Sequence, residues 1–232
     1  MLTGKEFVAK IVADNQALFK ASQLNVKAYF DSKPDQQELV DHFIGRMVNE
    51  RMNMVEISKA ISEMPADTDP VELELLTKQA LDEAIHFKLV KEVVEHIKGE
   101  KINVNDAISN ERRQNTAKGA ALLVKYDTEN DPIALACYQL VAEGRAEAVW
   151  NTMADCIEDS FISGRYAKIA RDEGFHASIG ARKLEKLLQS ESDRAHALDL
   201  VTRMRKDLYE ISCLNTTPAE EGRKLVTEAY GW

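Results

Sequence analysis

The amino-acid sequence predicts an all-α fold, and three observations lead to this prediction. Apolar residues recur at steps of three and four along most of the chain, as they do on one face of an amphipathic helix. No run of four to eight residues alternates convincingly between apolar and polar side chains, as a half-buried strand does. Glycine and proline are scarce, with 10 and 5 among 232 residues. Four of the predicted helices are long, so we expect a four-helix bundle with additional flanking helices.

Capping residues mark where several helices begin. Thr3 and Glu6 form a capping box at the first helix. Asp69–Pro70 and Asp131–Pro132 each combine an N-cap residue with a proline at the first helical position, and Thr217–Pro218 repeats this near the C-terminus. The predicted helices span about residues 4–21, 35–63, 70–98, 106–125, 132–157, 161–189, 193–213 and 218–229.

The chain is long enough to bury a large core, and nothing in its composition divides it. Hydrophobic residues make up 44% and charged residues 30%, which is typical of a globular protein. We therefore expect a single helical domain over residues 1–232, with the bundle core at about 35–190. A crossover segment at 99–131, with a helix of its own, would join the second bundle helix to the third.

Net charge and cysteine content argue against several partners. A net charge of −9 disfavours nucleic acid, which is bound through a basic face. No stretch approaches 18 uncharged apolar residues and the N-terminus lacks a long apolar core, so we predict neither a membrane segment nor a signal peptide. Three cysteines, Cys137, Cys156 and Cys213, do not make a disulfide framework. The prediction is a cytoplasmic protein.

Two segments, at 82–86 and 172–176, share the pattern Asp-Glu-x-x-His. A Glu and a His three residues apart lie on one face of a helix, so both can bind one metal ion. Carboxylate oxygen and imidazole nitrogen together suit iron or manganese. An ordinary surface pair is the alternative, but both copies lie on apolar faces, where an unpaired Glu would be costly. The candidate ligands are Glu83, His86, Glu173 and His176.

Two further helices carry a glutamate on their apolar faces. Glu50 falls within the helical series that contains Met47 and Met54, and a buried pair with a neighbouring lysine or arginine is its alternative role. In the 132–157 segment, Glu143 and Glu147 share one face. We favour Glu143 as the ligand, but the spacing does not separate the two.

Antiparallel geometry supports these pairings. If a short loop brings Glu50 level with Glu83, the loop should be centred midway between them, and the predicted helix break at 64–70 lies there. The midpoint of Glu143 and Glu173 likewise falls at the start of the predicted junction at 158–163. The midpoint for Glu147 falls in the same junction, so this test also leaves both glutamates open.

The complete pattern resembles the ferritin-like di-iron carboxylate family, over about residues 35–190. In that family two helices each supply one Glu, and two others each supply a Glu-x-x-His motif. The resemblance implies two iron ions, or a Mn/Fe or Mn/Mn pair. It also implies that Asp82 and Asp172 orient the ligand histidines by hydrogen bonds. The residues that would hold the metals are Glu50, Glu83, His86, Glu143, Glu173 and His176, with Glu147 as a possible extra ligand.

The resemblance implies an oxidoreductase that activates dioxygen to oxidise or oxygenate a small organic substrate, as an oxidase or monooxygenase. An electron donor and a homodimer are expected on the same basis. The multicomponent hydroxylases usually carry Arg just before the ligand His, and this chain has Ile85 and Phe175 there, so it departs from that subgroup.

Two other functions compete with this prediction. One is a ferroxidase or a rubrerythrin-like peroxide-reducing or iron-handling protein, although the chain has no four-cysteine rubredoxin module. The other is a metal-free helical scaffold. A scaffold is disfavoured because a bundle core without metal would bury four carboxylates uncompensated.

Overall fold

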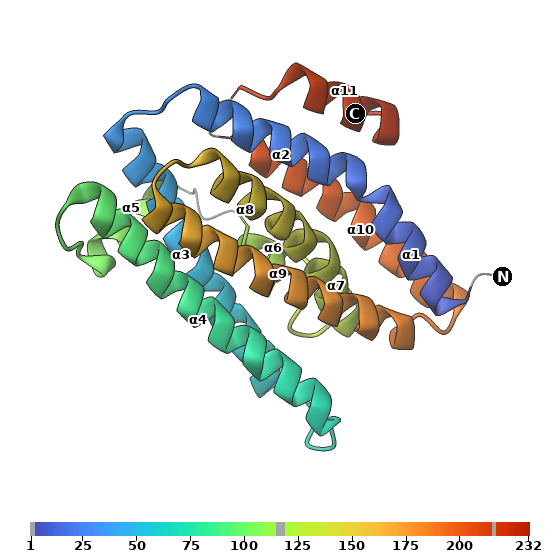
Figure 1. Ribbon diagram of the computed structural model, residues 1–232. Helices are drawn as coiled ribbons and strands as arrows, with labels where there is room; N and C mark the ends of the chain where they lie inside the picture. The colour runs from blue at the N-terminus through green and yellow to red at the C-terminus, as the bar shows by residue number, and fades with distance from the viewer. Residues whose placement is uncertain (1–2, 115–118, 215–216) are drawn as a thin grey trace. The chain divides into compact units, whose positions relative to one another are not determined.

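The computed structural model is all-α, which confirms the predicted fold class (Figure 1). It describes residues 3–114, 119–214 and 217–232, and these residues contain no strand. The chain divides into two compact units, residues 34–130 and residues 1–33 with 131–232. Within the described ranges, no helix has the length and apolar character needed to cross a membrane. The single domain over 1–232 stays a prediction.

The unit at 34–130 is built on a hairpin of two long helices, α3 (Gln36–Ser62) and α4 (Pro70–Lys98), which pack along each other (Figure 1). The side chain of Asp35 caps α3 in a capping box, and that of Asp69 caps α4. Gly99, with φ 72°, ends α4 in the left-handed conformation that glycine adopts readily. Both long helices therefore match the sequence prediction.

The crossover segment of this unit differs from the prediction. In place of one helix at 106–125, there are two helices, α5 (Val104–Gln114) and α6 (Ala121–Lys125), both against α3. The part of the predicted helix at 115–118 lies outside the described residues. The start of α6 is held by Asn49 of α3, whose Oδ1 accepts a hydrogen bond of 2.8 Å from the Ala120 amide. A contact distant in sequence therefore sets where α6 begins.

The second unit contains the remaining helices and one π-helical turn. Its elements are α1 (Gly4–Asp14), α2 (Gln16–Asp31), α7 (Pro132–Tyr138), the π turn η1 (Gln139–Glu143), α8 (Gly144–Cys156), α9 (Ser160–Leu187), α10 (Glu191–Ser212) and α11 (Glu220–Tyr230). The capping prediction at Asp131 is confirmed, because its side chain accepts hydrogen bonds from the amides of Ile133 and Ala134. The capping box at Thr3 and Glu6 is also present.

Two helix limits in this unit were wrongly predicted, and long-range hydrogen bonds explain both. The predicted helix at 4–21 is broken at Asn15, whose buried side chain accepts a 2.7 Å hydrogen bond from Arg205 Nε of α10. The last helix begins at Glu220 and not at Pro218, and the Ala219 amide donates a 2.9 Å hydrogen bond to Asn25 Oδ1 of α2.

The predicted helix at 132–157 is continuous in extent but contains the π turn η1. Helix α9 approaches this turn closely at Gly180. A Cβ atom at that position would lie 2.6 Å from the Ala136 carbonyl oxygen and 2.7 Å from the Leu140 amide nitrogen. Because these neighbours are backbone atoms, only glycine allows this approach, which brings α9 alongside the segment that carries Glu143.

Candidate metal-binding groups

The α3–α4 hairpin holds one group of buried carboxylate and imidazole side chains. Glu50 comes from α3, and Glu83 and His86 come from α4. Each offers a possible ligand atom, and these atoms lie within 4.8 Å of one another. His86 Nδ1 lies 3.9 Å from Glu50 Oε2 and 3.7 Å from Glu83 Oε2. The structure therefore brings together the three residues that the sequence predicted in this half.

The second unit holds a matching group. Glu143 ends the π turn, and Glu173 and His176 lie on α9. Their possible ligand atoms also lie within 4.8 Å of one another, and all three side chains are buried. His176 Nδ1 is within hydrogen-bonding distance of Glu173 Oε2, at 3.0 Å. We call these sets the α3–α4 group (Glu50, Glu83, His86) and the η1–α9 group (Glu143, Glu173, His176).

The donor atoms of both groups fit iron or manganese. Each group offers two carboxylates and one imidazole, which are the oxygen and nitrogen donors that these ions accept. Burial of two carboxylates so close together costs free energy that a divalent cation would offset. The groups contain no thiolate, so the set is less typical of structural zinc.

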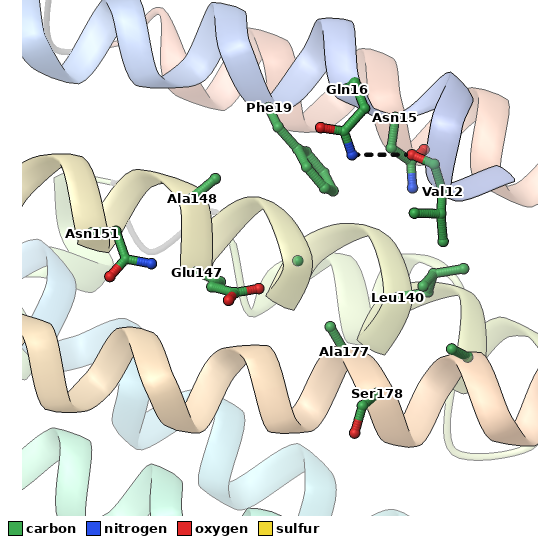
Figure 2. Close-up of a pocket in the computed structure, with 12 residues that line it drawn as sticks. Val12, Asn15, Gln16, Phe19, Leu140, Glu147, Ala148, Asn151, Ala177 and Ser178 are labelled. Carbon is green, nitrogen blue, oxygen red and sulfur yellow. Dashed lines mark hydrogen bonds between the residues drawn. The ribbon is translucent and has the colours of Figure 1, made fainter. Parts of the chain in front are cut away.

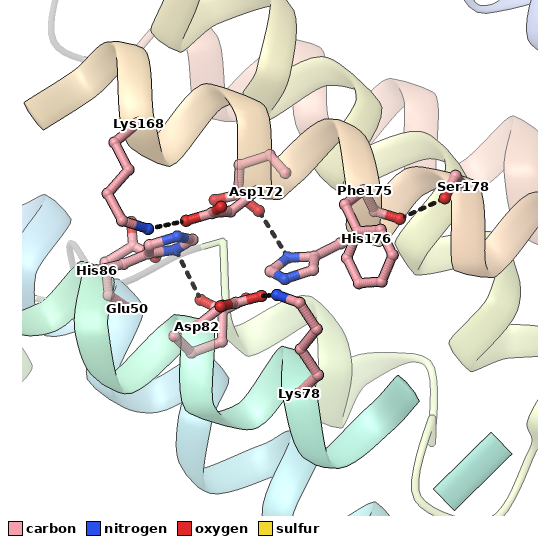
Figure 3. Close-up of polar contacts among 11 residues, drawn as sticks. Glu50, Lys78, Asp82, His86, Lys168, Asp172, Phe175, His176 and Ser178 are labelled. Atoms are coloured by element: carbon pink, nitrogen blue, oxygen red, sulfur yellow. Dashed lines mark hydrogen bonds and ion pairs between the residues drawn. The ribbon is translucent and has the colours of Figure 1, made fainter. Parts of the chain in front are cut away.

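In both Asp-Glu-x-x-His motifs, a lysine one helical turn earlier holds the aspartate (Figure 3). Lys78 Nζ donates to Asp82 on α4. Lys168 Nζ donates to Asp172 on α9, at 2.5 Å. Sequence reasoning missed both lysines, although the signal was present: the full repeat is Lys-x-Ala-x-Asp-Glu-x-x-His, at 78–86 and 168–176. The predicted hydrogen bonds from the ligand histidines to these aspartates stay a prediction.

Glu147 lies beside the η1–α9 group. It is partly buried, and its carboxylate occupies the space above Gly174, where a Cβ atom would lie 2.7 Å from Oε1. Burial and the nearby Glu173 carboxylate raise the pKa of Glu147. The structure thus places the two glutamates differently, and which of them binds metal stays a prediction. Glu143 belongs to the group, and Glu147 stands next to it.

The second unit also contains a pocket of about 460 Å³ that sequence reasoning did not find (Figure 2). It lies among α1, α2, η1, α8 and α9, and Glu147 forms part of its wall. The residues that line it are Val12, Asn15, Gln16, Phe19, Leu140, Gly144, Glu147, Ala148, Asn151, Ala177, Ser178 and Ala181. These residues are scattered over three parts of the sequence, so no local pattern could have predicted the pocket.

The structure thus defines an all-α protein with two buried carboxylate–histidine groups of the same composition. Its fold is similar to the crystal structure of a TenA homolog from Pseudomonas syringae pv. tomato str. DC3000, with a TM-score of 0.65. The alignment covers 91% of this chain and 94% of that chain at 11% sequence identity, which shows a shared fold alone. No protein-family model and no curated protein sequence matches the chain.

Proposed function

We propose that the protein is a non-haem di-iron enzyme that uses dioxygen to oxidise or oxygenate a small organic substrate. The observation that carries the proposal is the pair of buried Glu-Glu-His groups. Each group is built from a Glu-x-x-His motif on one helix and a glutamate from its partner helix, which is the ligand pattern of ferritin-like di-iron proteins. In this proposal each group supplies two carboxylates and one imidazole to an iron ion.

When bound, two ferrous ions supply the electrons that dioxygen accepts. The residues of the chain hold and tune these ions. The four carboxylates of the two groups balance the four positive charges of two divalent cations, which lowers the cost of burial. Asp82 and Asp172 orient the ligand imidazoles and fix the ring nitrogen that carries the proton. Lys78 and Lys168 in turn hold these aspartates in place.

A second candidate function, the reduction of peroxide or the oxidation of iron itself, is favoured by one observation. Glu147 provides an additional carboxylate next to Glu173, as an extra ligand would. The pocket beside Glu147 favours the first proposal, because a cavity of about 460 Å³ is of the size that binds small organic molecules.

Metal loading tests the proposal. The full chain is loaded anaerobically with ferrous iron, and bound iron and oxygen uptake are measured. Two iron ions per chain and oxygen uptake that rises with an organic substrate support an oxygenase or oxidase. Two iron ions with turnover of peroxide alone support the second candidate, and no bound iron contradicts both. His96→Ala, a change at an exposed position of α4 outside the group, is the control that should retain both ions.

A further inference from the structure

The pocket of the second unit adjoins the η1–α9 group. Glu147 faces the pocket (Figure 2). Its carboxylate also packs over Gly174, the residue that follows Glu173 in the chain. Small residues keep the space beside it open. A Cβ atom at Gly144 would lie 3.1 Å from Phe19 Cζ, and Ala148 and Ala177 complete this part of the wall. A molecule in the pocket would therefore contact Glu147 and lie close to the proposed ligand Glu173.

A buried polar group of the pocket wall points to a ligand. Asn15 is fully buried, and its Oδ1 accepts a hydrogen bond from Arg205 Nε. Its Nδ2 has no hydrogen-bond partner among the described residues. In Figure 2 the Asn15 side chain points from the α1–α2 junction toward Val12 and Leu140, which also line the pocket. A buried donor without an acceptor is costly, and an acceptor on a bound molecule would remove that cost.

The charges of the pocket select the class of ligand. Glu147 is the one ionisable side chain among the described residues that line it, and these include no lysine, arginine or histidine. Arg182 donates to Ser178 Oγ at 3.0 Å, but Arg182 itself does not line the pocket. A ligand carboxylate would meet a carboxylate at Glu147 without a lining cation to balance it, whereas an amine would find an acceptor there.

We infer that this pocket binds a small amine with an apolar body, and that its amino nitrogen lies at Glu147. A hydrogen-bond acceptor elsewhere in the molecule meets Asn15 Nδ2. As a substrate site, the pocket rests on the proposed function, but ligand binding itself requires no metal. The apolar part of the ligand packs against Phe19 and Leu140, which supply aromatic and aliphatic surface.

Binding of two matched probes to the metal-free full chain tests the inference by isothermal titration calorimetry. 4-Aminoacetophenone carries an amine and an acceptor, and 4-acetylbenzoate has a carboxylate in place of the amine. We expect the amine to bind at least about 10-fold more tightly. Glu147→Gln should remove this preference. Ala148→Phe, which fills the pocket, should abolish binding, whereas Ala195→Phe at an exposed site on α10 should have no effect.

Equal or tighter binding of the carboxylate, absence of amine binding, or an Ala148→Phe protein that binds the amine normally would each overturn the inference. If circular dichroism shows that Ala148→Phe does not fold, the Glu147→Gln variant alone tests the inference. Its preference for the amine over the carboxylate should then be lost. Iron content, measured on separate samples, distinguishes the two proposals. Amine binding without any iron binding would overturn the di-iron function and leave the pocket as an amine site. Iron binding without amine binding would overturn the pocket assignment alone.

Discussion

The α3–α4 hairpin and the η1–α9 pair carry the same nine-residue motif in different surroundings. The residue after the motif glutamate is Ala84 in the first copy and Gly174 in the second. In the structure the Glu147 carboxylate occupies the space that a side chain at 174 would enter. Glu147 lies four residues after Glu143, and the residue four after Glu50 is Met54. The motif thus sets the residue types of each group, and the partner helix decides whether an extra carboxylate fits beside them.

The two aspartate–lysine pairs also differ in exposure. The Asp82 side chain is 7% exposed, whereas that of Asp172 is 20% exposed. Solvent screens charge interactions more strongly at the exposed site. Asp172 is therefore the more exposed of the two aspartates, and it belongs to the unit that contains the pocket. We expect the α3–α4 group to act mainly in holding metal, and the η1–α9 side to act also on the substrate.

The largest expected effect comes from the two histidines that we propose as metal ligands. His86→Ala and His176→Ala should each reduce oxygen uptake by more than about 100-fold, because loss of a ligand exceeds the effect of losing a residue that only orients one. Bound iron should also fall in both variants, as measured by inductively coupled plasma mass spectrometry. If either variant keeps the iron content and turnover of the wild type, that group is not part of the metal site.

The aspartates should give the next largest effect. Asp82→Asn and Asp172→Asn should each lower iron affinity or activity by about 10–100-fold, since the aspartates orient ligands. The loss should be greater for Asp82, because less solvent screens it. Iron titration followed by fluorescence gives the affinities, with Lys78→Met and Lys168→Met as matched variants in which the carboxylate remains. Unchanged affinity in both asparagine variants would refute the orienting role.

Substitutions of Ala84 and Gly174, which follow the glutamates of the two motifs, test the steric difference between the two copies. Ala84→Gly should destabilise the protein by about 1 kcal/mol, which is the ordinary cost of glycine inside a helix. Gly174→Ala should gain up to about 1 kcal/mol on the same scale, because the conflicting atoms belong to the flexible end of Glu147. Urea unfolding measures both changes. A destabilised Gly174→Ala protein would show that Glu147 cannot move aside.

Gly180→Ala is the control for that experiment, because its conflict is with backbone atoms. It should cost about 1–3 kcal/mol through overpacking, and Gly174→Ala should not. Equal effects at the two glycines would remove the distinction between flexible and rigid neighbours.

The smallest expected effect concerns the pH dependence of the metal-free protein. The pKa of Glu147 is raised above its unfolded value of 4.5, first by burial and then by Glu173. The folded state therefore binds the proton more tightly, and the contribution of Glu147 to stability is lost as the pH rises above 4.5. Glu147→Gln should remove this loss, so its advantage over wild type in urea unfolding should grow between pH 4 and pH 7. An advantage that shrinks over this range would contradict the sign.

Local sequence signals predicted much of the fold and of both groups. Helices α3 and α4 begin and end as predicted, because Asp69–Pro70 and the apolar spacing act within one or two helical turns. The motif at 82–86 and its repeat placed Glu83, His86, Glu173 and His176 on helix faces for the same reason. The three residues of each group as defined above come from one unit. The metal itself stays a prediction.

By itself, the sequence determined the all-α class, the long hairpin helices and the residue types of both groups, because helical periodicity and capping are local properties. Only the tertiary structure shows that Glu143 lies within the η1–α9 group and that Glu147 lies beside it. A π turn carries an extra residue and rotates the side chains that follow it, so a 3.6-residue period no longer predicts how Glu143 and Glu147 are placed against α9. The break at Asn15 likewise depends on a hydrogen bond from Arg205. The pocket depends on three segments that are distant in the sequence. Such contacts join residues far apart in the chain, where no local pattern records them.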